Sequence, residues 1–94
     1  MMVPGTAVCW QAARRYAALR GRIIAVVEAG MTPVQAAPEL LGLKTTQVKF
    51  SDPSRPRAQR HYVIKREEEN QRGAWQVVYY LPPARCVASV RGAL

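Results

Sequence analysis

Apolar positions in the first third of the chain recur at helical spacing. Across residues 7–29 they fall on one face of a helix that turns by about 100° per residue, and Thr6 can cap its start. The stripe consists of Val8, Ala12, Tyr16, Leu19, Ile23 and Val26. The pattern predicts one long helix that ends at Gly30. A break into two helices near Gly21 is the alternative.

A second apolar stripe runs along the same predicted helix. It comprises Trp10, Ala13, Ala17 and Ile24. A helix that is apolar on two sides is either buried on both sides or shared with another chain. We therefore hypothesise that this stripe forms a homodimer interface. The alternative is that the C-terminal tail folds over it.

The pattern in residues 32–51 predicts two short helices with a turn between them. Thr32 is a good N-cap, and Pro33 suits the first helical position because its missing N–H would be unpaired there. Gln35 completes a Thr-x-x-Gln capping box. Gly42 can adopt the left-handed conformation that ends the first helix.

Strand-like patterns follow in the last third of the chain. Residues 61–67 and 74–81 are rich in β-formers, and a polar segment separates them. They predict a β-hairpin over residues 61–81. Two prolines then end the second strand, so residues 82–94 are expected to form a short, mildly apolar tail.

The middle segment resembles the helix-turn-helix of DNA-binding proteins. The resemblance rests on Thr32-Pro33-x-Gln35, the small Ala37, Leu41-Gly42-Leu43, and Val48. Together with the hairpin, the order helix, helix, helix, hairpin is that of a winged helix-turn-helix domain, and the resemblance then extends over residues 16–81. It implies an α+β fold with three helices, a long first helix and a C-terminal hairpin wing. One domain is expected in a chain of 94 residues.

In that family the second helix of the motif enters the major groove of DNA, and its early residues meet base edges. The resemblance implies the following base-reading residues: Lys44, Thr45, Thr46, Gln47 and Lys49. Residues 51–59 contain two prolines and no periodicity, which predicts a loop. The arginines in and after this loop are spaced for phosphate contacts, and they are Arg55, Arg57 and Arg60. The alternative for this segment is a solvated linker.

The charge of the chain favours a polyanionic partner. The formal net charge is +8. Residues 44–66 contain seven basic residues and one acidic residue, Asp52, so this quarter of the chain carries +6. Such a concentration is typical of a nucleic-acid-binding surface, and a basic surface kept for solubility is the alternative. Residues 67–69 are three glutamates that would repel phosphate, so we expect the hairpin tip to point away from DNA.

These patterns predict a sequence-specific double-stranded DNA-binding protein, acting as a small transcriptional regulator or as an accessory factor at a site. The alternative is a winged-helix module for protein–protein interaction without nucleic-acid binding. The two-sided helix and the acidic hairpin tip favour that alternative, and a fold does not fix a function. RNA binding is a weaker third option because no exposed aromatic platform is evident.

Neither an enzyme nor a bound cofactor, metal ion or small-molecule ligand is expected. Cys9 and Cys86 lie far apart and His61 stands alone, whereas a zinc site needs about four clustered ligands. The six glycines are scattered singly, which excludes a glycine-rich phosphate loop. The longest aliphatic run, residues 23–27, is too short for a membrane span, and residues 1–4 lack a basic leader region. A cytoplasmic protein that does not bind membranes is therefore expected.

Overall fold

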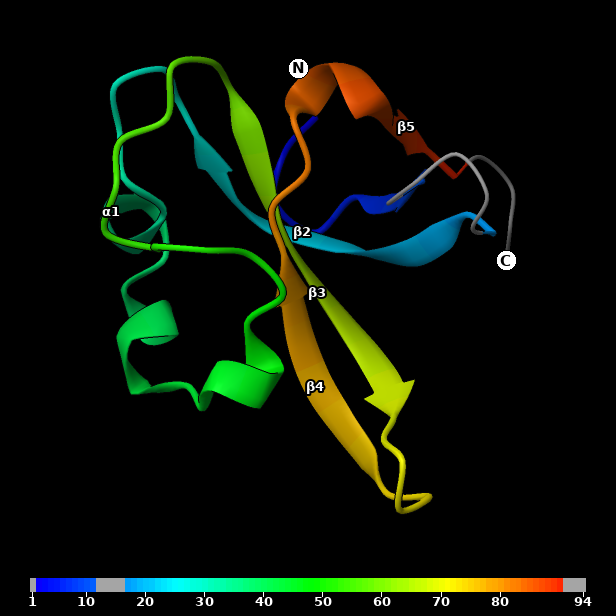
Figure 1. The fold of residues 1–94 in the computed structure, drawn as a ribbon. Helices are drawn as coiled ribbons and strands as arrows, with labels where there is room; N and C mark the ends of the chain where they lie inside the picture. The colour runs from blue at the N-terminus through cyan, green and yellow to red at the C-terminus, as the bar shows by residue number, and fades with distance from the viewer. Residues whose placement is uncertain (1, 12–16, 91–94) are drawn as a thin grey trace.

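A single antiparallel sheet forms the framework of the protein in a computed structural model that describes residues 2–11 and 17–90 (Figure 1). Its five strands are β1 (Ala7–Trp10), β2 (Leu19–Val27), β3 (His61–Glu69), β4 (Trp75–Tyr80) and β5 (Val87–Ser89). The strands lie in the order β4-β3-β2-β1-β5, so the first four form a meander and the fifth returns beside β1. A 3₁₀ turn, η3 (Ala84–Cys86), leads into β5.

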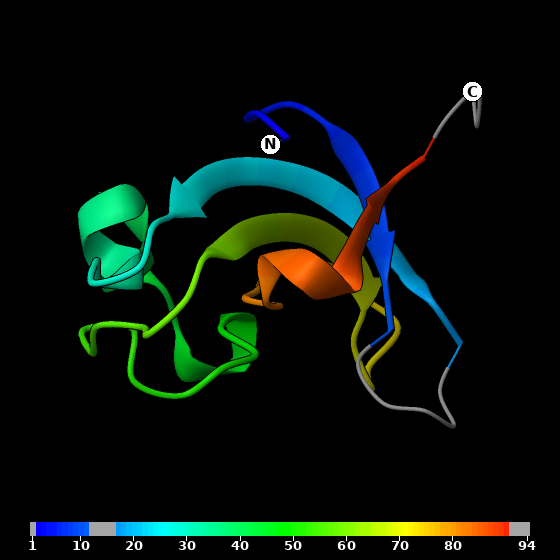
Figure 2. The ribbon, with the colours of Figure 1, turned by 90° about the horizontal axis from the view of Figure 1, so that it is seen from above.

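The sheet curves strongly, and its concave face encloses the first hydrophobic core. Seen from above, β2 and β3 arch together while β1 and β5 cross them at one end (Figure 2). The core consists of Val8, Trp10, Ile23, Tyr62, Ile64 and Val87. Tyr80 of β4 meets Trp10 edge-on, with ring centroids 5.2 Å apart. All five strands therefore contribute to one core, which holds the curvature in place.

The convex face of the sheet is covered in part by residues 28–60, which join β2 to β3 and are called the insertion. The insertion contains α1 (Pro33–Ala36) and two 3₁₀ turns, η1 (Pro38–Gly42) and η2 (Thr45–Gln47). The second hydrophobic core lies beneath it and consists of Ala25, Val27, Ala37, Leu40, Val63 and Tyr79. The central strands are thus apolar on both faces.

A β-bulge in β2 divides its apolar residues between the two cores. Ile23 lies opposite Ile64 and Ala25 lies opposite Val63, so Ile24 is the extra residue on β2. Because the bulge reverses the alternation, Ile23 faces the concave core and Ala25 faces the insertion. The bulge explains how an uninterrupted apolar run can be buried on both sides of the sheet.

The long helix predicted at residues 7–29 is wrong, because this segment forms β1 and β2. Residues 12–16, in the middle of the predicted helix, lie outside the described residues. The end of the segment is rich in β-branched side chains, which favour a strand. Arg20 and Arg22 are also exposed on either side of Gly21, which is the period of two expected of a strand.

Gly21 is needed for close packing of β2 against β3. A Cβ atom at this position would lie 2.6 Å from Ile64 Cγ2 and 2.7 Å from the carbonyl oxygen of Lys65. Glycine here therefore marks a close approach of two strands, in place of the weak point in a helix that the sequence suggested.

The predicted helix-turn-helix is absent from residues 32–51, all of which the structure describes, so the winged-helix fold is wrong. The capping box that begins it is confirmed: Gln35 N donates to Thr32 Oγ1 at 3.1 Å, and Thr32 N donates to Gln35 Oε1 at 2.8 Å. The helix nevertheless has only four residues. Pro38 pushes Ala37 out of the helical region, to φ −139° and ψ 82°.

The second helix of the predicted motif is reduced to the 3₁₀ turn η2. Immediately after this turn, Val48 is extended and forms a parallel bridge with Tyr79 on β4. Lys49 N also donates to the carbonyl oxygen of Tyr79 at 2.8 Å. The outer edge of β4 thus finds backbone partners in this segment, and edge pairing overrides the helical tendency of residues 44–51. Among the described residues, no helix is long and apolar enough to cross a bilayer.

A hairpin is present within residues 61–81, where the sequence predicts one. β3 and β4 pair from Ile64 opposite Tyr80 to Glu69 opposite Trp75. In the turn, Asn70 Oδ1 accepts hydrogen bonds from the backbone N–H groups of residues 72 and 74. The hairpin is a central part of the sheet and not a wing beside three helices. The predicted tail contains η3 and β5, and β5 pairs with β1.

Candidate functional site

Gln47, which is predicted to read DNA bases, uses its side chain for hydrogen bonds within the protein. Its Nε2 donates to the carbonyl oxygen of Val77 at 3.2 Å, and its Oε1 accepts from Lys44 N at 3.2 Å. This side chain therefore fastens η2 to β4. The other four predicted base-reading residues are exposed: Lys44, Thr45, Thr46 and Lys49. Lys44, Thr45 and Thr46 belong to the 3₁₀ turn η2 and its cap, and Lys49 lies along the edge of β4, so no α-helix presents these residues to a groove.

Two of the three arginines predicted to contact phosphate also serve the fold. The guanidinium of Arg57 donates to the carbonyl oxygens of Ser51 at 2.7 Å and Arg55 at 3.1 Å. Burial and the charge of Arg55 lower the pKa of Arg57, against the opposing effect of Asp52. Arg60 forms an ion pair with Glu28 at 2.6 Å, and the hydrogen bond and charge of Glu28 raise the pKa of Arg60. Arg55 is exposed.

The three described residues of the predicted homodimer interface do not share a face. Trp10 is 4% exposed and belongs to the concave core. Ile24 is half-buried at the bulge and packs against the second core, and Ala17 is exposed before β2 begins. Ala13 lies outside the described residues. The structural basis of that interface is therefore lost, and the homodimer itself stays a prediction that light scattering can test.

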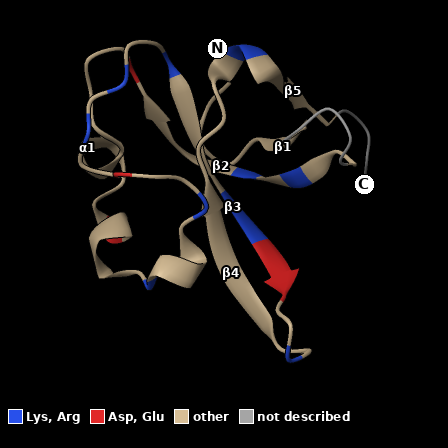
Figure 3. Ribbon diagram, viewed as in Figure 1, with Lys and Arg blue, Asp and Glu red and all other residues tan. Residues whose placement is uncertain are grey.

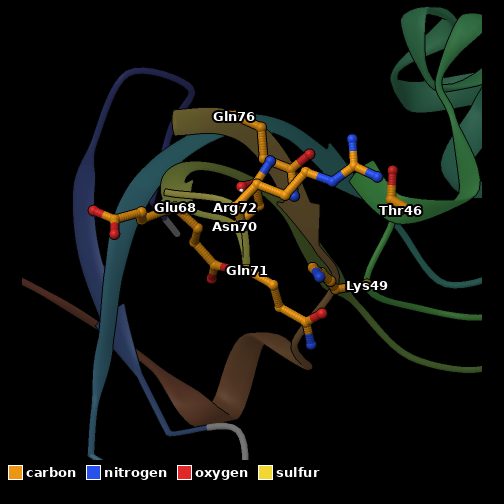
Figure 4. Close-up of a pocket in the computed structure, with 8 residues that line it drawn as sticks. Thr46, Lys49, Glu68, Asn70, Gln71, Arg72 and Gln76 are labelled. Carbon is orange, nitrogen blue, oxygen red and sulfur yellow. Dashed lines mark hydrogen bonds between the residues drawn. The ribbon is translucent and has the colours of Figure 1, made fainter. Parts of the chain in front are cut away.

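A polar cleft of about 510 Å³ lies between η2 and the end of the hairpin (Figure 4). It is lined by Thr46, Lys49, Glu68, Glu69, Asn70, Gln71, Arg72 and Gln76. The cleft gathers two of the predicted DNA-contacting residues, and Figure 4 shows Arg72 extending from the hairpin turn toward Thr46. Its two cations are matched by two carboxylates, so the cleft has no net charge with which to concentrate an anion.

Glu68 anchors a charged network at the edge of this cleft. It accepts hydrogen bonds from the hydroxyl of Tyr80 and, at 2.9 Å, from Nε of Arg66. Burial raises the pKa of the Glu68 carboxyl, but the bonds from Tyr80 and Arg66 and the charge of Lys49 outweigh it and lower the pKa below its ordinary value. Burial and the bond to Glu68 raise the pKa of Tyr80 to about 12. The network holds the Arg66 guanidinium beside a carboxylate.

A basic hollow of about 340 Å³ lies across β2 and β3. It is lined by Arg20, Gly21, Arg22, Lys65, Arg66 and Glu67. The lining carries four positive charges and one negative charge, a net charge of +3. Because Arg66 is already paired with Glu68, the cations left for a ligand are Arg20, Arg22 and Lys65. Figure 3 shows these basic segments side by side on the two strands.

The hollow opens onto a part of the convex face that the insertion leaves uncovered. Directly opposed residues in a sheet share a face, and on β3 and β4 these pairs are Lys65 with Tyr79, Glu67 with Val77, and Glu69 with Trp75. Tyr79 is buried under the insertion, whereas Trp75 is 68% exposed. The cover thus ends near Val77. The uncovered face is defined by Arg20, Arg22, Lys65, Glu67, Glu69 and Trp75.

Sequence reasoning misses most of this surface. The helical interpretation gives Arg20 no role and places Arg22 on a helix, although two arginines on either side of one glycine have the spacing of a strand face. The alternation of the second hairpin strand places Trp75 against the helices together with Val77 and Tyr79. The alternation is right, but the insertion stops short of Trp75, and no local pattern indicates where a cover ends.

No family model, no curated protein and no solved structure matches this chain. The geometry and charge of the described residues are therefore the basis on which a function can be assigned.

Proposed function

We propose that this protein binds nucleic acid by holding backbone phosphates in the basic hollow. The observation that carries the proposal is the gathering of Arg20, Arg22 and Lys65 on one exposed face, where Glu67 is the one carboxylate among the described lining residues. Cations that neutralise phosphates release condensed counterions, which drives binding. Guanidinium groups also match phosphate oxygens with two parallel hydrogen bonds. The role is one of binding and not of catalysis.

The arrangement of these cations supports a binding role because it opposes stability. Arg22 lies directly opposite Lys65 on the same face of the sheet. Like charges in directly opposed positions destabilise an antiparallel pair. Arg22 relieves this in part by donating from Nη1 to the carbonyl oxygen of Gly5 at 3.1 Å. A phosphate between the two side chains would convert the remaining repulsion into attraction.

Double-stranded DNA, the partner expected from the sequence, is the first ligand to test. The mode of contact differs from the one expected, because residues 32–51 form no helix that could enter the major groove. Contacts to phosphate position a protein on DNA but carry no sequence information. Any base preference must therefore come from side chains beside the hollow.

The test is a titration of labelled duplex DNA, followed by fluorescence anisotropy at about 50 mM and 200 mM salt. One variant combines Arg20→Gln, Arg22→Gln and Lys65→Gln. The matched control combines Lys44→Gln, Arg55→Gln and Arg72→Gln, three exposed positions outside the hollow, so both variants have a net charge of +5 (8 − 3). Circular dichroism confirms that both are folded.

We expect the hollow variant to lose most of its affinity, and its salt dependence to become shallower by about two to three units of slope, because each phosphate contact contributes about 0.9. The control should lose far less. An equal or larger loss in the control would move the interface to the insertion, and affinity that ignores both salt and the hollow variant would refute phosphate binding.

The alternative, a protein-interaction module, loses one of its two supports, the two-sided helix, and keeps the acidic end of the hairpin. A structural observation that also favours it is Leu41, which is 70% exposed beside a groove of about 330 Å³. The groove is lined mainly by apolar residues of the insertion: Leu40, Leu41, Leu43, Thr45, Val48, Phe50, Asp52 and Pro53. This alternative predicts that the wild-type protein binds no nucleic acid at either salt concentration, which the same titration measures.

A cytoplasmic location fits the proposed function. Both cysteines of the chain, Cys9 and Cys86, are free thiols, and Cys86 is exposed. Free exposed thiols are usual in reducing compartments, whereas small secreted domains tend to join their cysteines in disulfides. Cell fractionation of the tagged protein tests the location directly.

A further inference from the structure

We propose that the nucleic acid bound by the uncovered face contains an unpaired nucleotide, whose base stacks on Trp75 while phosphates of its strand lie in the basic hollow. This inference rests on the proposed function and names the ligand more closely. It makes Trp75 a binding residue and gives the protein a preference for single strands, or for duplexes with single-stranded ends.

Trp75 is placed where a base can reach its ring. It begins β4, lies opposite Glu69 and is 68% exposed, although it is among the largest apolar side chains of the protein. Trp10, in contrast, is 4% exposed within the concave core. Every base has an aromatic face, so an exposed aromatic side chain beside a basic surface is a common device for binding single strands.

The tryptophan and the basic hollow belong to one continuous surface. A small hollow of about 140 Å³ at the tryptophan is lined by Glu67, Trp75, Gln76 and Val77. Glu67 also lines the basic hollow, so the two hollows adjoin. From Lys65 to Glu69, the strand covers about 13 Å at about 3.3 Å per residue. That length corresponds to about four stacked nucleotides at about 3.4 Å each, and to fewer in an extended strand.

An unpaired nucleotide is required because of the shape of the surface. In a duplex the base faces are stacked on one another, and a protein reaches only their edges in the grooves. Trp75 stands on the face of a sheet, and none of the described helices carries it into a groove. An unpaired base exposes its whole face and can lie flat on the ring.

The charges along β3 fix the orientation of the strand. Figure 3 shows the strand passing from basic residues to acidic ones as it approaches the hairpin turn. Phosphates are attracted to the end with Lys65 and repelled from the end with Glu67 and Glu69, so the neutral base lies at the acidic end. A carboxylate accepts a hydrogen bond from an exocyclic amino group, as glutamate does from cytosine N4. The geometry thus favours cytosine and adenine over thymine, which has no such group.

The experiment compares labelled oligo-dC, oligo-dA and oligo-dT with a duplex of the same length, using the wild type, Trp75→Leu and Trp75→Phe. We expect Trp75→Leu to weaken binding of oligo-dC and oligo-dA by about five- to tenfold, because base stacking is lost. Trp75→Phe retains a ring and should recover part of that loss. Duplex affinity should change by less than about twofold in both variants, since duplex contacts are made by phosphates alone.

Wild-type binding to single strands that is unaffected by Trp75→Leu would overturn the inference, as would equal affinity for oligo-dC, oligo-dA and oligo-dT. In either case duplex binding that still depends on the basic hollow would leave the proposed function standing. If no nucleic acid binds at all, the proposed function fails first. Tryptophan emission is a second readout: ligand should quench wild-type fluorescence strongly and Trp75→Phe, which keeps only buried Trp10, much less.

Discussion

The insertion and the uncovered sheet face are both rich in cations, but they use them differently. In the insertion, Arg57 donates to two carbonyl oxygens and Arg60 is paired with Glu28. On the uncovered face, Arg20, Arg22 and Lys65 meet a single carboxylate, Glu67, among the described lining residues of the hollow. Of these three cations, Arg22 alone donates to a carbonyl oxygen within the described residues, that of Gly5 at 3.1 Å. A cation that already satisfies a carbonyl or carboxylate contributes less to an external ligand. A high density of cationic residues along the sequence therefore does not by itself make their charges available to a ligand at the surface.

The contrast follows from the kinds of backbone in the two regions. The insertion has little regular structure, so its backbone carbonyls need side-chain donors. Within the sheet, neighbouring strands satisfy most of the carbonyls, so fewer side chains are drawn into backbone bonds. Arg66 donates to the carbonyl oxygen of Arg20 at 2.9 Å, whereas Arg20 and Lys65 are left for other partners. A regular element thus offers a better platform for binding than an irregular loop of equal charge.

The largest effect is expected from a substitution that separates β2 from β3. Gly21→Ala places a Cβ atom 2.6 Å from Ile64 Cγ2 and 2.7 Å from a backbone oxygen. Something must move, and we expect a loss of about 2 kcal/mol in the free energy of unfolding, measured with urea. The basic hollow should also lose affinity for DNA, because both of its strands are displaced.

Gly42→Ala is the matched control for this prediction. Nothing lies within 4 Å of a Cβ atom at Gly42, in the insertion. The same change there should alter the free energy of unfolding by less than about 0.5 kcal/mol. A similar loss in both variants would show that the effect comes from glycine itself and not from the packing of β2 on β3.

Gly21 also shows why the first two strands could not be predicted from the sequence. The apolar positions of residues 7–29 fit a helical stripe, and they also fit two strands once a bulge is allowed at Ile24. The hairpin at residues 61–81 was predictable because two β-rich runs lie close together. The pairing of β5 with β1 joins residues about 80 positions apart, and no local pattern encodes such a contact.

Only the basic character of the candidate site was predictable from the sequence, and its position was not. The net charge of +8 leads to the expectation of a polyanionic partner, and this expectation does not depend on the fold. Lys44, Thr45, Thr46 and Lys49 lie at the surface, but the 3₁₀ turn in and beside which they lie is not a reading helix. The cations of the basic hollow come from two strands some 40 residues apart in sequence, with the insertion between them. Their proximity is a property of the sheet register, which had to be known first.

A pH titration of stability tests the bond between Tyr80 and Glu68, and its expected effect is of intermediate size. The Tyr80 pKa is raised from 10.0 to about 12, so the folded state holds this proton more tightly than the unfolded state does. The stabilising effect is present below pH 10 and is lost as the pH rises from 10 to about 12. Tyr80 is only half-buried, and solvent screening reduces the effect to about 1 kcal/mol.

The measurement is the free energy of unfolding of the wild type and of Tyr80→Phe at intervals from about pH 8 to about pH 12. The difference between them should shrink as the pH rises, because only the wild type loses the bond to Glu68. A difference that stays constant would mean that the Tyr80–Glu68 bond does not hold the network. Other titrating groups affect both proteins alike and cancel in the comparison.

The smallest effect on stability is expected from a change in the capping box of α1, which is the clearest pattern in the sequence. Thr32→Ala removes the acceptor for Gln35 N, and we expect it to lower the free energy of unfolding by about 1 kcal/mol. Thr45→Ala, at an exposed position of the same insertion, should change it by less than about 0.5 kcal/mol.

DNA affinity should be unchanged in both variants, because α1 covers the second core and does not adjoin the basic hollow. Loss of DNA binding in Thr32→Ala, with folding intact, would show that the insertion takes part in the interface after all. A capping box can thus be correct in every bond and still determine only four residues of helix, because Pro38 and the edge of β4 determine the conformation of the residues after it.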